Sequence, residues 1–186
     1  MKRCKVIIGA AGLSLAVGMA GSASVASAAS TPSKATVRAI TTNKMVPNRY
    51  IQDGLRWNHD VYRVRSGGTV TVINSAANEG PHTLTIVKPT DVPKTAAQVF
   101  NCKICNILGA AHGADPNSDA PPTFQFLENG TGQATAPDVD RPGDSGLTGP
   151  GRKGEKITMK VTAKKGAKLR FMCLLHPWMQ ARLDVG

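Results

Sequence analysis

Histidine and cysteine are scarce in this chain of 186 residues, with four of each. No two histidines are separated by a single residue, so the H-x-H pairs that build the trinuclear cluster of a multicopper oxidase are missing. This ligand count excludes such an oxidase or a copper nitrite reductase. No Ser/His/Asp set and no pair of carboxylates stands out for hydrolysis, and we find no internal repeats. We therefore expect no catalytic residues and no enzyme.

Long apolar runs are also missing, although the N-terminus carries a short one. A basic start is followed by VIIGAAGLSLAVGMAG and by small residues that end in Ala26-Ser27-Ala28. This order is typical of a secretory signal peptide, here residues 1–28. The run is short for the about 20 residues that span a membrane. We expect cleavage to leave one exported domain, residues 29–186, without a stable membrane span, in the periplasm, the cell envelope or the extracellular space.

Four side chains that bind soft metals lie in two short stretches. Cys173, His176 and Met179 occur within seven residues in FMCLLHPWMQARLDV, and His82 lies in the alternating run GPHTLTIV. One thiolate, two imidazoles and a thioether are the donor set of a mononuclear type 1 copper site. No second cysteine lies between Cys173 and the His-Met pair, which excludes the binuclear copper centre of oxidase subunits. The sequence predicts one copper ion held by these four residues.

The ligand loop C-x2-H-x2-M, with Pro177 directly after the histidine, resembles that of amicyanin in the plastocyanin/azurin superfamily of cupredoxins. The resemblance covers residues 61–87 and about 155–186, and it implies an all-β Greek-key sandwich. Both blocks alternate around glycine turn signals, as strands do. In the family the first histidine begins a strand, and the other ligands follow the penultimate strand.

Three neighbours of the ligands are expected to tune the metal. The carbonyl of Pro81 is the natural second axial oxygen, because it directly precedes His82. Thr83 is placed to bond the loop that bears Cys173, where many family members carry Asn. Leu175 stands where the amicyanin-like pattern often has proline, so it keeps an N–H that can donate to the thiolate and raise the reduction potential.

The stretch from about 88 to 154 is longer than the corresponding part of a compact cupredoxin, and we interpret it as an insertion. Its first part, KTAAQVFNCKICNILGAAHG, predicts a short helix, and its second part is dense in Pro, Gly, Asp and Ser, which predicts a long loop.

Cys102 and Cys105 form a C-x2-C pair in this stretch. A local disulfide fits an oxidising compartment. A second metal site with His112, reactive dithiol chemistry, and a zinc site shared with Cys173 and His176 are the alternatives, although the zinc site leaves His82 and Met179 unexplained.

The sequence predicts a one-electron carrier that docks redox proteins near His176. We expect the ring edge of His176 to be exposed there through an apolar patch of Leu174, Leu175, Pro177 and Trp178. An envelope protein that stores, delivers or senses copper is the alternative on the same fold. Without the three cations of residues 1–28 the chain has 20 Lys and Arg against 12 Asp and Glu, a net charge of +8. Scattered basic residues and the absence of a recognisable motif argue against nucleic acid. The positive charge agrees with docking to an acidic redox partner or to an anionic envelope, or with a solvated surface that keeps the protein soluble.

Overall fold

The computed structural model describes residues 30–76, 80–115, 117, 118 and 120–186. The predicted signal peptide, residues 1–28, lies outside these ranges. Within them, no helix is both long and apolar enough to span a membrane.

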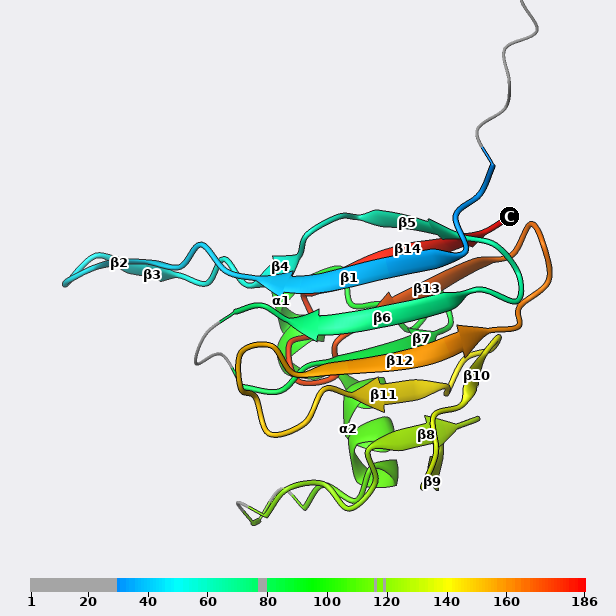
Figure 1. The fold of residues 1–186 in the computed structure, drawn as a ribbon. Helices are drawn as coiled ribbons and strands as arrows, with labels where there is room; N and C mark the ends of the chain where they lie inside the picture. The colour runs from blue at the N-terminus through cyan, green and yellow to red at the C-terminus, as the bar shows by residue number, and fades with distance from the viewer. Residues whose placement is uncertain (1–29, 77–79, 116, 119) are drawn as a thin grey trace, which may run out of the picture.

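Two β-sheets face each other and form a sandwich (Figure 1). In spatial order, the five-stranded sheet contains β10 (Asp138–Val139), β12 (Lys156–Val161), β6 (Thr69–Asn74), β1 (Lys34–Ile40) and β4 (Arg56–Trp57). The seven-stranded sheet contains β5 (Val61–Val64), β14 (Gln180–Val185), β13 (Lys168–Met172), β7 (Thr83–Val87), β11 (Ser145–Leu147), β8 (Phe126–Glu128) and β9 (Thr131–Gln133). A separate hairpin of β2 (Lys44–Val46) and β3 (Tyr50–Gln52) projects from the sandwich in Figure 1.

The core follows from alternation along the strands. In β1, β6, β12 and β14 every second side chain is buried, because successive side chains of a strand point to opposite faces. Fully buried side chains from both sheets, such as Val37, Val72, Phe171 and Leu183, belong to one apolar cluster. The predicted all-β sandwich is therefore confirmed.

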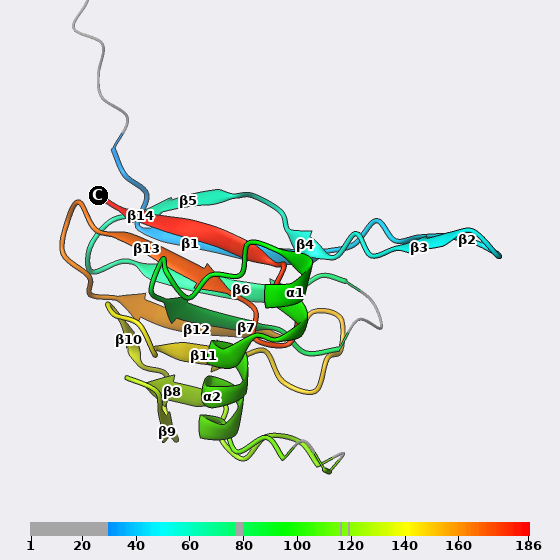
Figure 2. The ribbon, with the colours of Figure 1, turned by 180° about the vertical axis from the view of Figure 1, so that it is seen from behind.

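Residues 88–155, which we call the connecting segment, join β7 to β12 and contain both described helices. These are α1 (Ala96–Phe100), which begins after the cap residue Thr95, and α2 (Lys103–Ala111). Figure 2 shows them against the outer side of the seven-stranded sheet. The predicted partly helical character of this stretch is confirmed.

The second part of the connecting segment is not the long loop that its Pro and Gly content predicted. It forms β8 to β11, and β11 pairs with β7 and so extends the sheet. Leu127 and Leu108 pack with Val87 and Met172 in a second apolar cluster. This cover explains why all five residues of β7 are buried, whereas an uncovered strand would alternate.

Strand pairing brings the two ligand-bearing stretches to the same end of the sandwich. β7 and β13 are antiparallel neighbours with Thr85 opposite Met172, so the start of β7 meets the end of β13. At that end Gly151, with φ of 104°, lies against the backbone before β7. A Cβ there would lie 2.5 Å from the carbonyl carbon of Gly80, which only glycine avoids.

Candidate metal centre

Three of the four predicted ligands converge at this end of the sandwich. His82 directly precedes β7, Cys173 directly follows β13, and His176 lies in the loop that leads into β14. Their donor atoms all lie within 4.8 Å of one another. Among the described residues, this is the one group of three or more His, Cys, Asp or Glu side chains arranged in this way.

The spacing of the donor atoms fits a metal ion. The sulfur of Cys173 lies 4.0 Å from Nδ1 of His82 and 3.6 Å from Nδ1 of His176. Metal bonds of about 2.0 Å to nitrogen and about 2.3 Å to sulfur place such donors about 3.7 Å apart in a trigonal arrangement. The group is therefore able to bind one copper ion without a large rearrangement.

Burial sets the protonation of the cluster. It lowers the pKa of His82 to about 4, with a smaller effect from the charge of His176. Burial also lowers the pKa of His176, against the opposing charge of Asp53. Both imidazoles are therefore neutral at pH 7, and their lone pairs are free for a metal.

The thiol of Cys173 is fully buried, and burial raises its pKa. The backbone N–H groups of Thr83, His176 and Leu175 oppose this effect on the pKa and favour the thiolate. That the N–H of Leu175 donates to a metal-bound thiolate and raises the reduction potential stays a prediction. Thr83 donates its N–H to the sulfur at 3.4 Å and accepts the N–H of Leu174 at 2.8 Å through its hydroxyl. Thr83 thus contacts the loop that bears Cys173, and its effect on a bound metal stays a prediction.

The loop from Cys173 to Met179 is closed by its own backbone. Cys173 donates its N–H to the carbonyl of Met179 at 3.0 Å, and Met179 donates to the carbonyl of His176 at 2.8 Å. The side chain of Met179 is fully buried in the same cluster as Cys173. Its role as axial ligand, and that of the Pro81 carbonyl, stay predictions.

Two tryptophans hold the loop. Trp57 donates its indole N–H to the carbonyl of Met179 at 3.0 Å. Its ring packs edge-on with that of His82, and the two ring centroids are 6.0 Å apart. Trp178 donates its indole N–H to the carbonyl of Leu55 at 3.1 Å. Its ring packs against that of His176, with the two ring centroids 5.4 Å apart. The sequence did not single out Trp57, because its contacts come from a residue more than 100 positions away.

Sequence reasoning also missed a residue of the connecting segment, Thr148, that holds the backbone of His82 by two hydrogen bonds. Thr148 accepts the backbone N–H of His82 at 3.0 Å through its hydroxyl and donates its own N–H to the His82 carbonyl at 2.9 Å. It lies in a stretch whose composition signalled a loop, so nothing in the sequence pointed to it.

Cys102 and Cys105 lie apart from the metal cluster. They form a disulfide of 1.95 Å at the start of α2. His112, proposed as their partner in a second metal site, instead contacts the carbonyl of Phe124 and the hydroxyl of Ser145.

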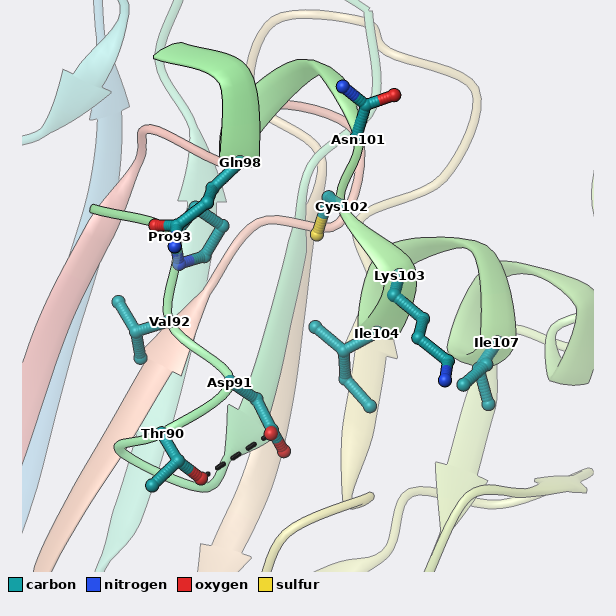
Figure 3. A pocket seen from close by; sticks show the side chains of 10 residues that line it. All are labelled: Thr90, Asp91, Val92, Pro93, Gln98, Asn101, Cys102, Lys103, Ile104 and Ile107. Atoms are coloured by element: carbon teal, nitrogen blue, oxygen red, sulfur yellow. Dashed lines mark hydrogen bonds between the residues drawn. The ribbon is translucent and has the colours of Figure 1, made fainter. Parts of the chain in front are cut away.

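A groove lies beside this disulfide, between the stretch after β7 and the two helices (Figure 3). Its charged groups are Asp91, which accepts a hydrogen bond from Thr90, and Lys103. The groove contains none of the three clustered donors, so it is a separate surface feature.

The apolar surface next to His176 differs from the one predicted. We expected Leu174, Leu175, Pro177 and Trp178 to be exposed there, but Leu174 and Pro177 are buried. Leu175 and Trp178 are 49% and 40% exposed and share a hollow with Phe100, which is 84% exposed. We call Leu175, Trp178 and Phe100 the apolar rim. Leu174 turns inward because it packs in the cluster under α2.

No protein-family model and no curated protein matches the chain. Solved structures similar to it include auracyanin A from Chloroflexus aurantiacus, described as a "blue" copper protein, at 17% identity, with 83% of this chain and 99% of that chain covered and a TM-score of 0.40. The reduced auracyanin of Roseiflexus castenholzii is 19% identical, with coverages of 70% and 87% and a TM-score of 0.38.

Rusticyanin from Thiobacillus ferrooxidans is 14% identical, with 84% of this chain and 79% of that chain covered and a TM-score of 0.32. Because all three TM-scores lie below 0.5, these likenesses carry no conclusion about the function of this chain. The two-sheet sandwich and the His-Cys-His group themselves fit the cupredoxin pattern that the sequence resembles.

Proposed function

We propose that this chain is an exported type 1 copper protein of the cupredoxin family that carries one electron between redox partners and is not an enzyme. The observation that supports it most is the position of two neutral imidazole nitrogens, 4.0 and 3.6 Å from one buried thiol sulfur. His82, Cys173 and His176 would hold the ion, with the buried Met179 as a weak axial ligand. The bound ion supplies the Cu(II)/Cu(I) couple.

The protein's own contribution is to keep these donors in place. Thr148 fixes the backbone of His82, Thr83 fixes the start of the ligand loop, and Trp57 fixes its end. Ligands held by such a second set of contacts move little when the charge of the site changes. A rigid, buried site favours repeated electron transfer over release of the ion.

The half-buried His176 is the natural route for the electron, since His82 and Cys173 are fully buried. The apolar rim beside it offers a surface on which a redox protein can dock, and the excess of basic residues would steer an acidic one.

The test is the colour of the copper-loaded protein. We expect one copper per chain and an intense blue band from thiolate-to-Cu(II) charge transfer. Cys173→Ser should abolish the band and leave the circular dichroism of the sandwich unchanged. Cys102→Ser/Cys105→Ser is the matched control and should stay blue, because these sulfurs are bonded to each other. A colourless Cu(II) protein, or preferential zinc binding, would overturn the proposal.

A further inference from the structure

The hairpin of β2 and β3 carries large apolar side chains outside the core. Met45 and Ile51 are opposite each other in the register and therefore lie on one face of the hairpin. They are 70% and 80% exposed, and Tyr50, next to Ile51 in the chain, is 51% exposed. Figures 1 and 2 both show the hairpin standing away from the two sheets. Apolar side chains gathered on such an element mark a surface that binds another molecule.

The charges of the hairpin have one sign. Lys44 and Arg49 are exposed on it, and no Asp or Glu occurs from residue 41 to residue 52. Cations beside exposed apolar side chains and a tyrosine are typical of a segment that lies in the headgroup layer of a membrane with anionic lipids. In that layer the apolar side chains leave water, and the cations contact lipid phosphates.

The hairpin is held in a defined shape at its tip and at its base. At the tip Arg49 donates its N–H to the carbonyl of Val46 at 3.0 Å, and Asn48 has a φ of 59°, a turn conformation that asparagine tolerates. At the base Gly54 donates its N–H to the side chain of Asn43 at 2.7 Å. A ribbon fixed in this way loses little conformational entropy when it binds.

The base of the hairpin continues into the part of the chain that contacts the metal centre. The carbonyl of Leu55 accepts the indole N–H of Trp178, whose ring packs against that of His176. Trp57, two residues later, donates to the Met179 carbonyl at the end of the ligand loop. The hairpin therefore leaves the sandwich at the metal-bearing end, and the molecule that it binds lies near that end.

The size of the hairpin favours a lipid surface over a protein partner. Its two strands and the turn between them comprise residues 44–52, nine in all. A stable protein interface buries about 800 Å² on each partner and uses about 20–30 residues a side. A membrane sets no such minimum, because each inserted apolar side chain and each cation near an anionic lipid contributes separately.

We propose that the hairpin anchors this protein to the surface of a membrane that contains anionic lipids, with Met45 and Ile51 in the headgroup layer and Lys44 and Arg49 on the lipid phosphates. The metal-bearing end then faces the same membrane. The redox partner is accordingly a protein in or on that membrane. This last consequence rests on the proposed function, whereas the anchor itself does not.

Vesicle binding tests the apolar part of the anchor. Residues 29–186, which contain both described sheets, are mixed with vesicles of phosphatidylglycerol and phosphatidylcholine, and the bound fraction is measured by sedimentation. Ile51→Ser should lower the partition coefficient about tenfold, because one apolar side chain no longer leaves water. Ile107→Ser makes the same change at a 53% exposed position on α2 and should leave the coefficient unchanged.

Charge reversal tests the cations. Lys44→Glu/Arg49→Glu should weaken binding more than about tenfold, since each cation near an anionic surface contributes separately. Lys164→Glu/Lys165→Glu changes the net charge equally at two exposed positions after β12. Because β6 is parallel to β1 and antiparallel to β12, these lysines lie at the end opposite the hairpin. This control should weaken binding less than about threefold.

Equal binding to phosphatidylglycerol vesicles and to vesicles of phosphatidylcholine alone would overturn the anchor. Equal losses in either variant and its control would overturn it as well. Circular dichroism checks that every variant folds. Cys173→Ser should bind vesicles like the wild type, because no metal donor takes part. A wild-type protein that binds the anionic vesicles but shows no blue band with copper would overturn the proposed function and leave the anchor in place.

Discussion

At the scale of single residues, His82 shows how burial prepares a side chain for a metal. The imidazole is fully buried, and among the described residues its Nε2 has no hydrogen-bond partner. Protonation would place an uncompensated charge in the core, and this is why its pKa falls to about 4. The same burial makes the metal-free protein sensitive to acid.

We expect the metal-free protein to lose stability as the pH falls from about 6.5 to about 4. In this window the unfolded chain binds a proton at His82 and the folded chain does not, so the free energy of unfolding decreases as the pH falls. The lowered pKa corresponds to about 3 kcal/mol. Denaturant titrations at several pH values measure it. His82→Leu should make the dependence shallower without abolishing it, because burial also lowers the pKa of His176 and of His112. Equal slopes in both proteins would contradict the argument.

The three clustered side chains, His82, Cys173 and His176, could be singled out from the sequence because each bears a distinctive donor and lies beside an alternating strand. Thr148 could not, since threonine is common and the stretch that carries it signals only turns. Its importance comes from hydrogen bonds to a residue 66 positions earlier, which no local pattern records.

At the scale of elements, the loop between β13 and β14 divides its side chains between two tasks. Leu174 packs inward under α2, whereas Leu175 points outward on the apolar rim. The sequence predicted the loop itself but treated both leucines as surface, because α2 had not been placed over this part of the sheet. The strands of the connecting segment were missed for a related reason. They are two or three residues long, too short for a periodic pattern.

Leu175→Glu should slow electron exchange with a redox protein by about tenfold while leaving the blue band unchanged. A charge on the apolar rim must be desolvated when a partner docks, and a penalty of about 1.4 kcal/mol corresponds to this factor. Stopped-flow kinetics with a second cupredoxin would measure the rate. Ile107→Glu is the matched control, since Ile107 is similarly exposed, at 53%, but lies on α2 outside the hollow of the rim. Equal rates in the two variants would place the docking surface elsewhere.

At the scale of the whole molecule, the net charge influences how fast the protein meets a charged redox partner. Residues 29–186 carry a net charge of +8. Surface charges of this kind act over about 10 Å at 0.1 M salt and are screened as salt increases.

The rate of electron transfer from the reduced protein to an anionic iron cyanide complex should therefore fall as the ionic strength rises from about 0.01 to 0.5 M. With a cationic cobalt complex of similar size it should rise, because repulsion is screened instead. Stopped-flow measurements compare the two reagents on the same protein. The same trend with both reagents would mean that the charge near the reacting edge does not follow the net charge.

The position of β14 in its sheet has a consequence for how the chain is made. This strand joins β5 to β13, although it begins eight residues after β13 ends and is the last strand in the sequence. A ribosome releases the chain from its N-terminus, so β5 and β13 emerge before the strand that connects them. Until Gln180–Val185 has emerged, the loop that carries the thiol has no second anchor. A chain without β14 contains all three donors but lacks the strand that closes their loop, so we expect the closed metal site to form only once this strand has paired.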